Sequence, residues 1–266
     1  MLKNLLIKLK NWFFKKENHQ MIKDLSEILN HQNKDQIPVL IVCYNNGVHV
    51  LNMVEQLNKF KIIPIIINNA STDTETLLTL NKIKDLGLAH LIHSKKNFGH
   101  LIGFRDSIYA LLPEVFAYTD PDLQLNENLP NDFLWQLAAI TNKYSVYKAG
   151  FALTLLASEQ MIDNHHLKIK FRPFTFKKEF NVLEWEKRFW RFKLNNQEYD
   201  LFQADIDTTF AVYRKSNFSG NFFDAIRVAG NFEAIHLPWY PNLDLIDSNQ
   251  KKIYTHKNLS SSWLKK

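Results

Sequence analysis

Two short apolar runs near the start of the chain constrain the fold more than any other feature. They cover residues 37–44 and 62–67, and each has the length of a strand that is buried on both faces. Between them Val48, Leu51 and Val54 recur at every third position, which is typical of an amphipathic helix. Strands that alternate with helices of about a dozen residues predict an α/β fold, with a mostly parallel central sheet and helices on both faces.

The same alternation continues toward residue 125. Thr72 and Glu75 form a capping-box pattern, which predicts a helix that ends near Gly87. Beyond residue 144 the pattern is less regular, so the carboxyl-terminal third is expected to be variable. The remaining predictions are strands over residues 88–93, 115–119, 145–155 and 208–213, a helix over 100–111, and a helix that begins at Asn131 or Asp132.

Charge and cysteine content narrow the classes of partner. The net charge of +6 suits an anionic small substrate, an anionic membrane surface or nucleic acid alike. The sequence has no zinc-finger spacing, no aromatic ribonucleoprotein motif and no dense basic helix, so a nucleic-acid partner is not expected. The single cysteine, Cys43, excludes an internal disulfide, and its place in the first apolar run predicts a buried, unreactive thiol. A reducing cytoplasm fits this cysteine usage.

Residues 1–30 are expected to form a helical extension before the main domain. Within residues 1–16, leucines and Phe13 fall on one face at helical spacing, while lysines lie mostly on the other. No apolar run approaches the ~20 residues that a membrane-spanning helix needs. Two alternatives stay open for this basic segment: it lies on an anionic membrane surface as a peripheral anchor, or it packs on its own domain.

Acidic and amide side chains follow two of the predicted strands. Asp120 and Asp122, separated by Pro121, come directly after the strand at residues 115–119, and the polar cluster at residues 68–73 follows an earlier strand. In open α/β sheets, ligands bind at the carboxyl ends of strands. Two carboxylates at such an end supply the oxygen ligands that Mg²⁺ and Mn²⁺ prefer and share with substrate phosphates. The sequence therefore predicts a metal site beside a nucleotide site.

The order of these segments resembles that of family 2 glycosyltransferases with the GT-A fold. The resemblance rests on Tyr44-Asn45, Asn68 to Asp73, Asn97-Phe98-Gly99 and Asp120-Pro121-Asp122. Residues 207–214, and two blocks at residues 227–230 and 236–240, are similar more loosely to a bacterial subgroup of the family. The resemblance implies one GT-A-like domain over residues 37–266, in which residues 37–125 bind a nucleotide-sugar and residues 126–266 bind the acceptor.

The resemblance also implies roles for individual residues. Asn68 stands where the family usually has Asp, and because an amide both donates and accepts, the base, normally uracil, stays open. Arg105 either binds a phosphate bidentately or pairs with Asp106. His236 either completes the metal shell or positions an acceptor loop. The implied donor-binding residues are Tyr44, Asn45, Asn68, Asn69, Asn97, Gly99, Arg105 and Asp120, and the implied ligands of Mn²⁺ or Mg²⁺ are Asp120, Asp122 and His236.

A catalytic base is the part that the sequence leaves least defined. Members of the family that invert the sugar need a carboxylate that takes the proton from the acceptor hydroxyl. The family often supplies it from a Glu-Asp pair, which this chain lacks. Asp207, just before the strand at residues 208–213, is the first candidate, and Asp205 is the alternative. Three further carboxylates stay open, namely Asp224, Glu184 and Glu186.

These expectations lead to one function and two alternatives. The expected function is inverting, metal-dependent transfer of a sugar from a nucleoside-diphosphate donor, a UDP-sugar in most of the family. The acceptor would be a hydroxyl of a bacterial surface glycan or of a lipid-linked glycan. One alternative is a nucleotidyltransferase that forms sugar nucleotides, although the segment after the first strand has a single glycine, Gly47, instead of a glycine-rich loop. The other is a family member that binds a nucleotide-sugar without turnover, which the missing Glu-Asp pair favours.

Overall fold

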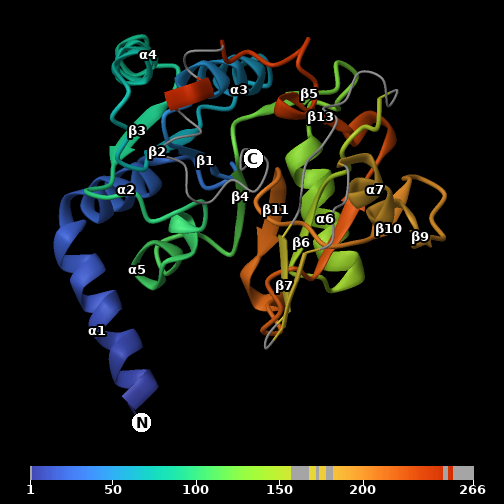
Figure 1. Ribbon diagram of the computed structural model, residues 1–266, viewed down its shortest axis with the longest axis horizontal. Helices are drawn as coiled ribbons and strands as arrows, with labels where there is room; N and C mark the ends of the chain where they lie inside the picture. Colours follow the sequence, from blue (N-terminus) through green and yellow to red (C-terminus); the bar gives the residue numbers. More distant parts are fainter. Residues whose placement is uncertain (1, 157–167, 172–173, 178–181, 248–250, 254–266) are drawn as a thin grey trace.

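The computed structural model describes residues 2–156, 168–171, 174–177, 182–247 and 251–253. Within this part of the chain, a nine-stranded sheet lies at the centre of the molecule (Figure 1). In the order in which they pair, its strands are β3 (His90–His93), β2 (Ile65–Asn68), β1 (Val39–Cys43), β4 (Val115–Thr119), β11 (Ala211–Arg214), β6 (Lys148–Phe151), β12 (Ala225–Val228), β10 (Leu201–Gln203) and β9 (Lys193–Leu194).

Most strands of this sheet run in the same direction. The pairs β2–β3, β1–β2, β1–β4 and β6–β12 are parallel, and within the described sheet only β11 and β10 run against the other strands. The predicted α/β fold with a mostly parallel central sheet is therefore confirmed. The reversal at β11 matters for the site, because it brings the residues before β11 next to the carboxyl end of β4.

Helices cover both faces of the sheet, as predicted. Successive side chains of a strand point to opposite faces, so Val39 and Ile41 of β1 enter one core and Leu40 and Val42 enter the other. The first core is completed by α3 (Gly47–Lys59), α4 (Thr74–Asp85) and α6 (Phe133–Tyr144). The second is completed by α2 (His19–His31), η1 (Ile102–Phe104) and α5 (Asp106–Tyr109) (Figure 1).

Cys43 lies in the first of these two cores, at the end of β1. The side chain is fully buried, as predicted, and burial raises the pKa of its thiol to about 12. A thiol that holds its proton so firmly is a poor nucleophile at neutral pH. Cys43 therefore belongs to the packing of the sheet and takes no part in the site described below.

The helix predicted over residues 100–111 is wrong. The chain forms η1 and α5 instead, with Arg105 extended between them at φ −67° and ψ 135°. Tertiary packing explains the break, because a Cβ at Gly103 would overlap the ring of Tyr118. The hydroxyl of Tyr118 also donates a 2.6 Å hydrogen bond to the carbonyl oxygen of His100. The sheet thus holds this segment too closely for a continuous helix to form.

The predicted capping residue of α4 is wrong by one position. The cap is Asp73 and not Thr72, because the Asp73 carboxylate accepts a 2.8 Å hydrogen bond from the amide of Thr76. A carboxylate at this position satisfies a free amide and faces the positive end of the helix dipole. The predicted end near Gly87 is right: α4 ends at Asp85, and Gly87 adopts a positive φ of 66°.

Shorter elements complete the carboxyl-terminal half. A small antiparallel sheet pairs β5 (Leu123–Leu125) with β13 (Ala234–His236), and it places His236 opposite Leu123. This pairing places residues 234–236 next to the segment that follows β4. The other short elements are β7 (Lys168–Phe171), β8 (Phe174–Lys177), α7 (Val182–Lys187), η3 (Arg188–Trp190), η4 (Lys215–Asn217), η5 (Gly230–Phe232) and η6 (Leu237–Trp239).

The expected amino-terminal extension is helical, and part of it belongs to the core. α1 (Leu2–Glu17) runs away from the other elements toward its amino-terminal end (Figure 1). At its other end Phe14 is only 2% exposed, and Asn18 accepts hydrogen bonds from the Ser94 hydroxyl and the Lys95 amide at 3.2 and 3.0 Å. Among the described helices, none combines the length and the apolar character that crossing a membrane requires.

Candidate functional site

The tips of β1 and β2 are joined by the side chain of Asn45. Its side-chain oxygen accepts hydrogen bonds from the amides of Thr72 and Asp73 at 2.7 and 3.0 Å, and the backbone amide of Asn45 donates to the Ser71 hydroxyl at 3.0 Å. Asn45 adopts a positive φ of 53°, which Asn tolerates better than most residues. Its side-chain nitrogen is buried without a hydrogen-bond partner among the described residues. Asn45 therefore fixes the segment after β1 to the segment after β2, and its side-chain nitrogen remains an unused hydrogen-bond donor.

The loop at residues 97–99 is attached to the tip of β2 by Asn69. The Asn69 nitrogen donates to the side-chain oxygen of Asn97 at 2.9 Å and to the carbonyl of Gly99 at 3.0 Å, while its oxygen accepts from the Phe98 amide at 2.9 Å. Gly99 has a φ of 81°, a conformation that glycine adopts at no steric cost. The three segments that resemble donor-binding motifs thus meet at one edge of the sheet.

Asn68 and Tyr44, both predicted to bind the donor, lie within the same cluster. The Asn68 oxygen accepts a 2.9 Å hydrogen bond from the Ser71 amide, and its nitrogen lies 3.2 Å from Nδ1 of His93. Asn68 is 3% exposed, so its side-chain amide is buried and its hydrogen bond to Ser71 fixes the loop that follows β2. Tyr44 is half-buried, and its backbone amide donates to Asn46 at 3.0 Å. Contact of these two residues with a nucleotide stays a prediction.

Asp120 ends β4 at the same edge and is held by the strand that returns beside it. Because β4 and β11 are antiparallel, Thr208 arrives opposite Asp120: the Asp120 amide donates to the Thr208 carbonyl at 3.0 Å, and the Thr208 hydroxyl donates to the Asp120 carboxylate. Burial, and then the nearby Asp122 carboxylate, raise the pKa of Asp120 well above its usual range, against the hydrogen bond from Thr208. Two carboxylates this close therefore oppose each other's ionisation, which a bound cation would relieve.

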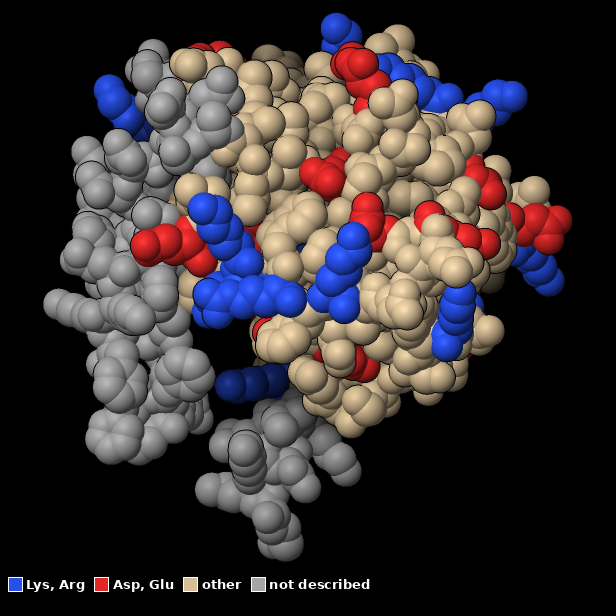
Figure 2. Space-filling view, turned by 90° about the vertical axis from the view of Figure 1, so that its right-hand side faces the viewer, with Lys and Arg blue, Asp and Glu red and all other residues tan. Residues whose placement is uncertain are grey.

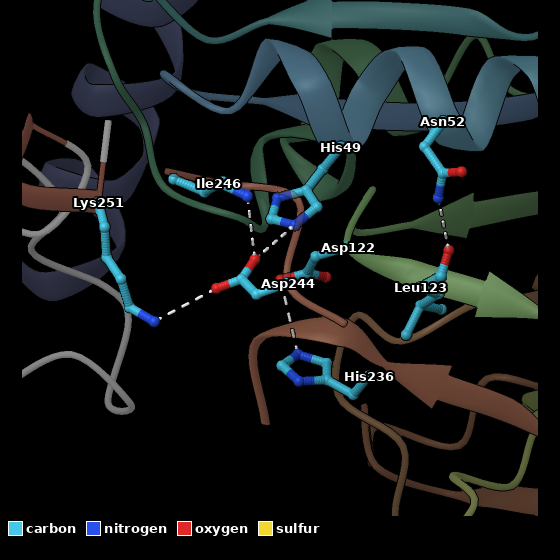
Figure 3. Close-up of polar contacts among 8 residues, drawn as sticks. All are labelled: His49, Asn52, Asp122, Leu123, His236, Asp244, Ile246 and Lys251. Carbon is cyan, nitrogen blue, oxygen red and sulfur yellow. Dashed lines mark hydrogen bonds and ion pairs between the residues drawn. The ribbon is translucent and has the colours of Figure 1, made fainter. Parts of the chain in front are cut away.

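Asp122 faces His236, which the β5–β13 pairing brings to it (Figure 3). Nε2 of His236 lies 3.5 Å from Oδ2 of Asp122, and the two side chains are 12% and 14% exposed. Burial lowers the pKa of His236, with Asp122 opposing the shift, so the imidazole is neutral near pH 7. A neutral imidazole and a carboxylate are both suitable ligands for a divalent cation.

The residues present fit a divalent cation that is shared with a substrate. Oδ1 of Asp122 is buried and has no hydrogen-bond partner among the described residues, although a buried carboxylate oxygen is normally paired. A bound cation would give this oxygen a partner, and it would also offset the repulsion between the carboxylates of Asp120 and Asp122. Within the described part of the chain, no group of three or more His, Cys, Asp or Glu side chains forms a preassembled metal cage. Such a partial ligand set suits Mg²⁺ or Mn²⁺, which usually keep waters and substrate phosphates as ligands.

A cleft of about 270 Å³ opens beside the acidic pair. One wall consists of Asp120, Asp122 and His236, and Asp205 and Asp207 line it from the segment before β11. Aromatic side chains of α7, η3 and the carboxyl-terminal segments complete it, namely Trp185, Phe189, Phe223 and Trp239. A cleft that combines carboxylates with flat apolar rings suits a ligand that offers both hydroxyl groups and C–H faces.

The structure separates the five carboxylates considered as a catalytic base. Asp205 and Asp207 are exposed at the cleft, and Oδ1 of Asp207 lies 3.7 Å from Nε2 of His100. Glu186 also lines the cleft, but it is 2% exposed and forms a buried ion pair with Arg227. Asp224 and Glu184 are not among the residues that line the cleft. Asp207 and Asp205 therefore remain the candidates whose carboxylates are exposed at the cleft.

A second polar group lies close to Asp122 and His236 (Figure 3). Nε2 of His49 lies 3.1 Å from Oδ1 of Asp244, and Oδ2 of Asp244 lies 3.3 Å from Nζ of Lys251. His49 stands in the first turn of α3, so these contacts join the carboxyl-terminal segment to the helix that follows β1. The hydrogen bond from His49, together with its charge, lowers the pKa of Asp244 despite burial. The group lies beside Asp122 and His236, and its residues do not line the cleft.

Not every residue of the predicted site comes together. The guanidinium of Arg105 lies over the rings of Phe14 and Phe98, at 5.5 and 5.4 Å from their centroids, and Arg105 does not line the cleft. Its contact with a phosphate stays a prediction. Four residues around the site were not predicted from the sequence to belong to it, namely Thr208, His100, Arg227 and the buried Lys148. For Lys148 a signal existed, because a lysine inside the apolar run at residues 145–155 is unusual.

Comparison with known proteins adds little at the level of sequence. No model of a known protein family matches the chain, and no curated protein matches it either. Among solved structures, it is similar to the mannosyltransferase PcManGT from Pyrobaculum calidifontis in complex with GDP-Man and Mn²⁺, with a TM-score of 0.47, 9% identity, 94% of this chain covered and 72% of the other. It is also similar to S. aureus TarS 1–349, with a TM-score of 0.37, 14% identity, 67% of this chain covered and 47% of the other. Both likenesses are too low to assign a function to this chain.

Proposed function

We propose that this protein is a metal-dependent glycosyltransferase of the GT-A type that uses a nucleoside-diphosphate sugar. One observation carries the proposal: Asp120 and Asp122 stand at the carboxyl end of β4, beside a cleft and next to the joined tips of β1 and β2. This is the edge at which open α/β sheets bind nucleotides. The order of motifs that resembles family 2 supports the same conclusion from the sequence, and a UDP-sugar is the proposed donor.

The donor would lie across the tips of the parallel strands. Its base and ribose would contact the cluster around Tyr44, Asn45 and Asn68, and its diphosphate would lie at Asp120 and Asp122, which with His236 would hold Mn²⁺ or Mg²⁺. When bound, the cation supplies positive charge to the departing nucleoside diphosphate. The chain's own part is to align the donor and to exclude water from the bond that breaks.

The acceptor would enter from the side of Trp185, Phe189 and Phe223. Asp207, with Asp205 as the alternative, would accept the proton of the attacking hydroxyl, and a single in-line displacement would invert the sugar. On the face shown in Figure 2, acidic and basic side chains are interspersed and do not gather into a field of one sign. We propose that the groups inside the cleft select the acceptor. A bacterial surface glycan or lipid-linked glycan is the acceptor class that we propose from the resemblance.

We further propose that the enzyme works in the cytoplasm and contacts the membrane peripherally through residues 1–16. Leu9, Trp12 and Phe13 of α1 are 44%, 54% and 55% exposed although they are large and apolar. Lysines at positions 10, 15 and 16 lie on the same helix, which has no acidic residue in its first turn. Exposed aromatic rings beside lysines are the combination that enters the interface of an anionic leaflet.

The test is an assay of purified protein with a panel of nucleotide-sugars, Mn²⁺ and glycan acceptors. We expect release of nucleoside diphosphate together with a glycosylated product of inverted anomeric configuration. Asp122→Asn should lower turnover by at least about 100-fold, because the charge that holds the cation is lost. Asp85→Asn, which changes an exposed carboxylate at the end of α4, is the matched control and should leave turnover unchanged.

Other outcomes would assign a different function. Formation of a sugar nucleotide from a nucleoside triphosphate and a sugar phosphate would identify a nucleotidyltransferase. Binding of a nucleotide-sugar without turnover, with every acceptor and cation tried, would identify a binding protein. Full activity of Asp122→Asn would contradict the metal assignment even if sugar transfer is observed.

A further inference from the structure

The segment that carries the two candidate bases is held from within the sheet by two buried cations. Nζ of Lys148 donates a 3.0 Å hydrogen bond to the backbone carbonyl of Asp207. Nε of Arg227 donates a 2.9 Å hydrogen bond to the backbone carbonyl of Asp205. Lys148 is 0% exposed and Arg227 is 4% exposed. Because both cations bind the main chain of this segment, the two carboxylates stay free to face the cleft.

The sheet explains why the two cations act on the same segment. Lys148 lies in β6 and Arg227 in the neighbouring parallel strand β12, with Lys148 paired to Ala225 and Gly150 paired to Arg227. Residues two apart along a strand share a face, so both side chains project from the same face of the sheet. The adjacent strand β11 begins just after the segment, at Ala211. The 205–207 segment therefore passes over the side chains of Lys148 and Arg227 before the chain enters β11.

The surroundings of Lys148 argue against a role in stability alone. Its ammonium lies 3.7 Å from the ring centroid of Phe222 and 5.0 Å from that of Tyr213. Among the described residues, no carboxylate oxygen lies within ion-pair distance of it, so one carbonyl and two rings replace its hydration shell. Removing an ammonium from water costs several kcal/mol, which a single hydrogen bond and two cation–π contacts offset only in part. An apolar side chain would fill this place at a lower cost.

Arg227 extends the same support to the aromatic wall of the cleft. Its Nη1 bonds the buried carboxylate of Glu186 in α7, while its Nε bonds Asp205. The ring of Phe189 covers the guanidinium at 4.1 Å from the ring centroid. The planar fork of arginine presents Nε and Nη1 to two separate partners, whereas a lysine has a single nitrogen for both. Arg227 thus couples the position of α7 and η3 to the position of the 205–207 segment.

We propose that Lys148 and Arg227 are positioning residues, which hold the 205–207 segment so that the Asp207 carboxylate faces the cleft beside Asp120 and Thr208. The proposal rests on the proposed function only where it gives Asp207 the role of the base. The position of the segment is a separate property that can be measured without turnover. Misplacement of a catalytic group by about 1 Å costs about 100-fold in rate, so the segment must be held firmly if Asp207 is the base.

The experiment compares Lys148→Met with Lys215→Met. Lys215 is a matched control, because its Nζ also donates to backbone carbonyls, those of Tyr109 and Leu112 at 3.0 and 2.8 Å, but it follows the far end of β11. Hydrogen exchange followed by mass spectrometry should show at least about 10-fold faster exchange at residues 204–208 in Lys148→Met and no change there in Lys215→Met. The kcat for sugar transfer should fall by about 10- to 100-fold in Lys148→Met, while the KM for the donor changes less than about 3-fold.

Two further variants keep the test decisive. Lys148→Gln retains a neutral donor if Lys148→Met does not fold, and Arg227→Lys retains the charge but loses one of the two partners, so each should loosen the same segment. Unchanged exchange at residues 204–208 in folded variants of both positions would overturn the proposal. Faster exchange in an enzyme whose wild-type form transfers no sugar would leave the positioning intact and would refute the proposed function instead.

Discussion

At the scale of a single residue, Lys148 is a side chain whose burial lowers the stability of the fold while it holds a segment of the candidate site. The side chain lies in a strand whose other residues are apolar or glycine, and burial lowers its pKa to about 7 although Asp207, Asp205 and Asp224 act to raise it. Arg227 adds a further lowering contribution. Burial thus favours the neutral amine more than water does, whereas the ammonium is the form that binds a carbonyl most strongly. The same side chain therefore has a lowered pKa within the sheet and holds the backbone of Asp207 at the cleft.

The pKa of Lys148 predicts how stability depends on pH. The folded pKa of about 7 lies below the ordinary value of 10.5, so between these values the unfolded chain binds more protons than the folded chain, and the free energy of unfolding rises with pH. Lys148→Met should lack this rise and should be more stable by about 1–3 kcal/mol near pH 7. Urea unfolding at about pH 7 and about pH 10 measures both effects, with Lys215→Met as the control. Parallel pH profiles for wild type and Lys148→Met would contradict this account.

At the scale of elements, α1 combines a buried end with an exposed body. Phe14 contacts both the ring of Phe98, at 4.7 Å between centroids, and the guanidinium of Arg105, at 5.5 Å from the Phe14 centroid. Earlier in the same helix, Trp12 and Phe13 contact each other at 5.0 Å between centroids but stay exposed to water. One end of the segment therefore packs on its own domain, while residues 9–13 include large apolar side chains that are exposed, and membrane contact stays a prediction.

This division predicts which substitutions affect membrane contact. The double variant Trp12→Ala/Phe13→Ala should bind vesicles rich in phosphatidylglycerol at least about 10-fold more weakly than wild type, because two large apolar side chains no longer enter the interface. Trp135→Ala is the matched control, since Trp135 is 52% exposed but lies on α6. Co-sedimentation with vesicles measures the binding. Equal sedimentation of wild type and the double variant would exclude α1 as the membrane contact.

At the scale of the whole molecule, the site depends on segments from both halves of the chain. Asp120 and Asp122 follow β4, whereas Thr208 precedes β11 and His236 ends β13. The antiparallel pairs β4–β11 and β5–β13 bring the later residues to the earlier ones. A ligand that contacts both groups adds contacts between the halves, so its binding should stabilise the folded molecule as a unit.

This arrangement predicts a large effect of the donor on thermal unfolding. With Mn²⁺ and a nucleotide-sugar at about 100 times its Kd, binding should add about 2.7 kcal/mol and raise Tm by about 5–10 °C. Asp122→Asn should lose most of this increase, whereas Asp85→Asn should retain it. Differential scanning fluorimetry with and without each ligand gives the measurement. An equal increase in wild type and Asp122→Asn would place the nucleotide elsewhere.

The local pattern of the sequence was sufficient to predict the class of fold. The buried runs that became β1 and β2, the strand β4 and the helices α3, α4 and α6 all followed from hydrophobic periodicity, because each buries its own face with residues close in sequence. The prediction failed at residues 100–111, where close packing of Gly103 on Tyr118 overrode the helical pattern. Propensity is a weak guide wherever a tertiary contact of this kind decides the backbone.

What the sequence determined by itself is therefore the buried strands of the first half and the polar residues that follow them, including the acidic pair Asp120 and Asp122. The tertiary structure alone decided which distant residues meet that pair, as Thr208 and His236 do through antiparallel pairing. It also decided that Lys148 and Arg227 lie beneath the 205–207 segment. The physical reason is that periodicity records which face of an element avoids water, whereas the partner across a sheet is set by strand order and direction, which no local pattern contains.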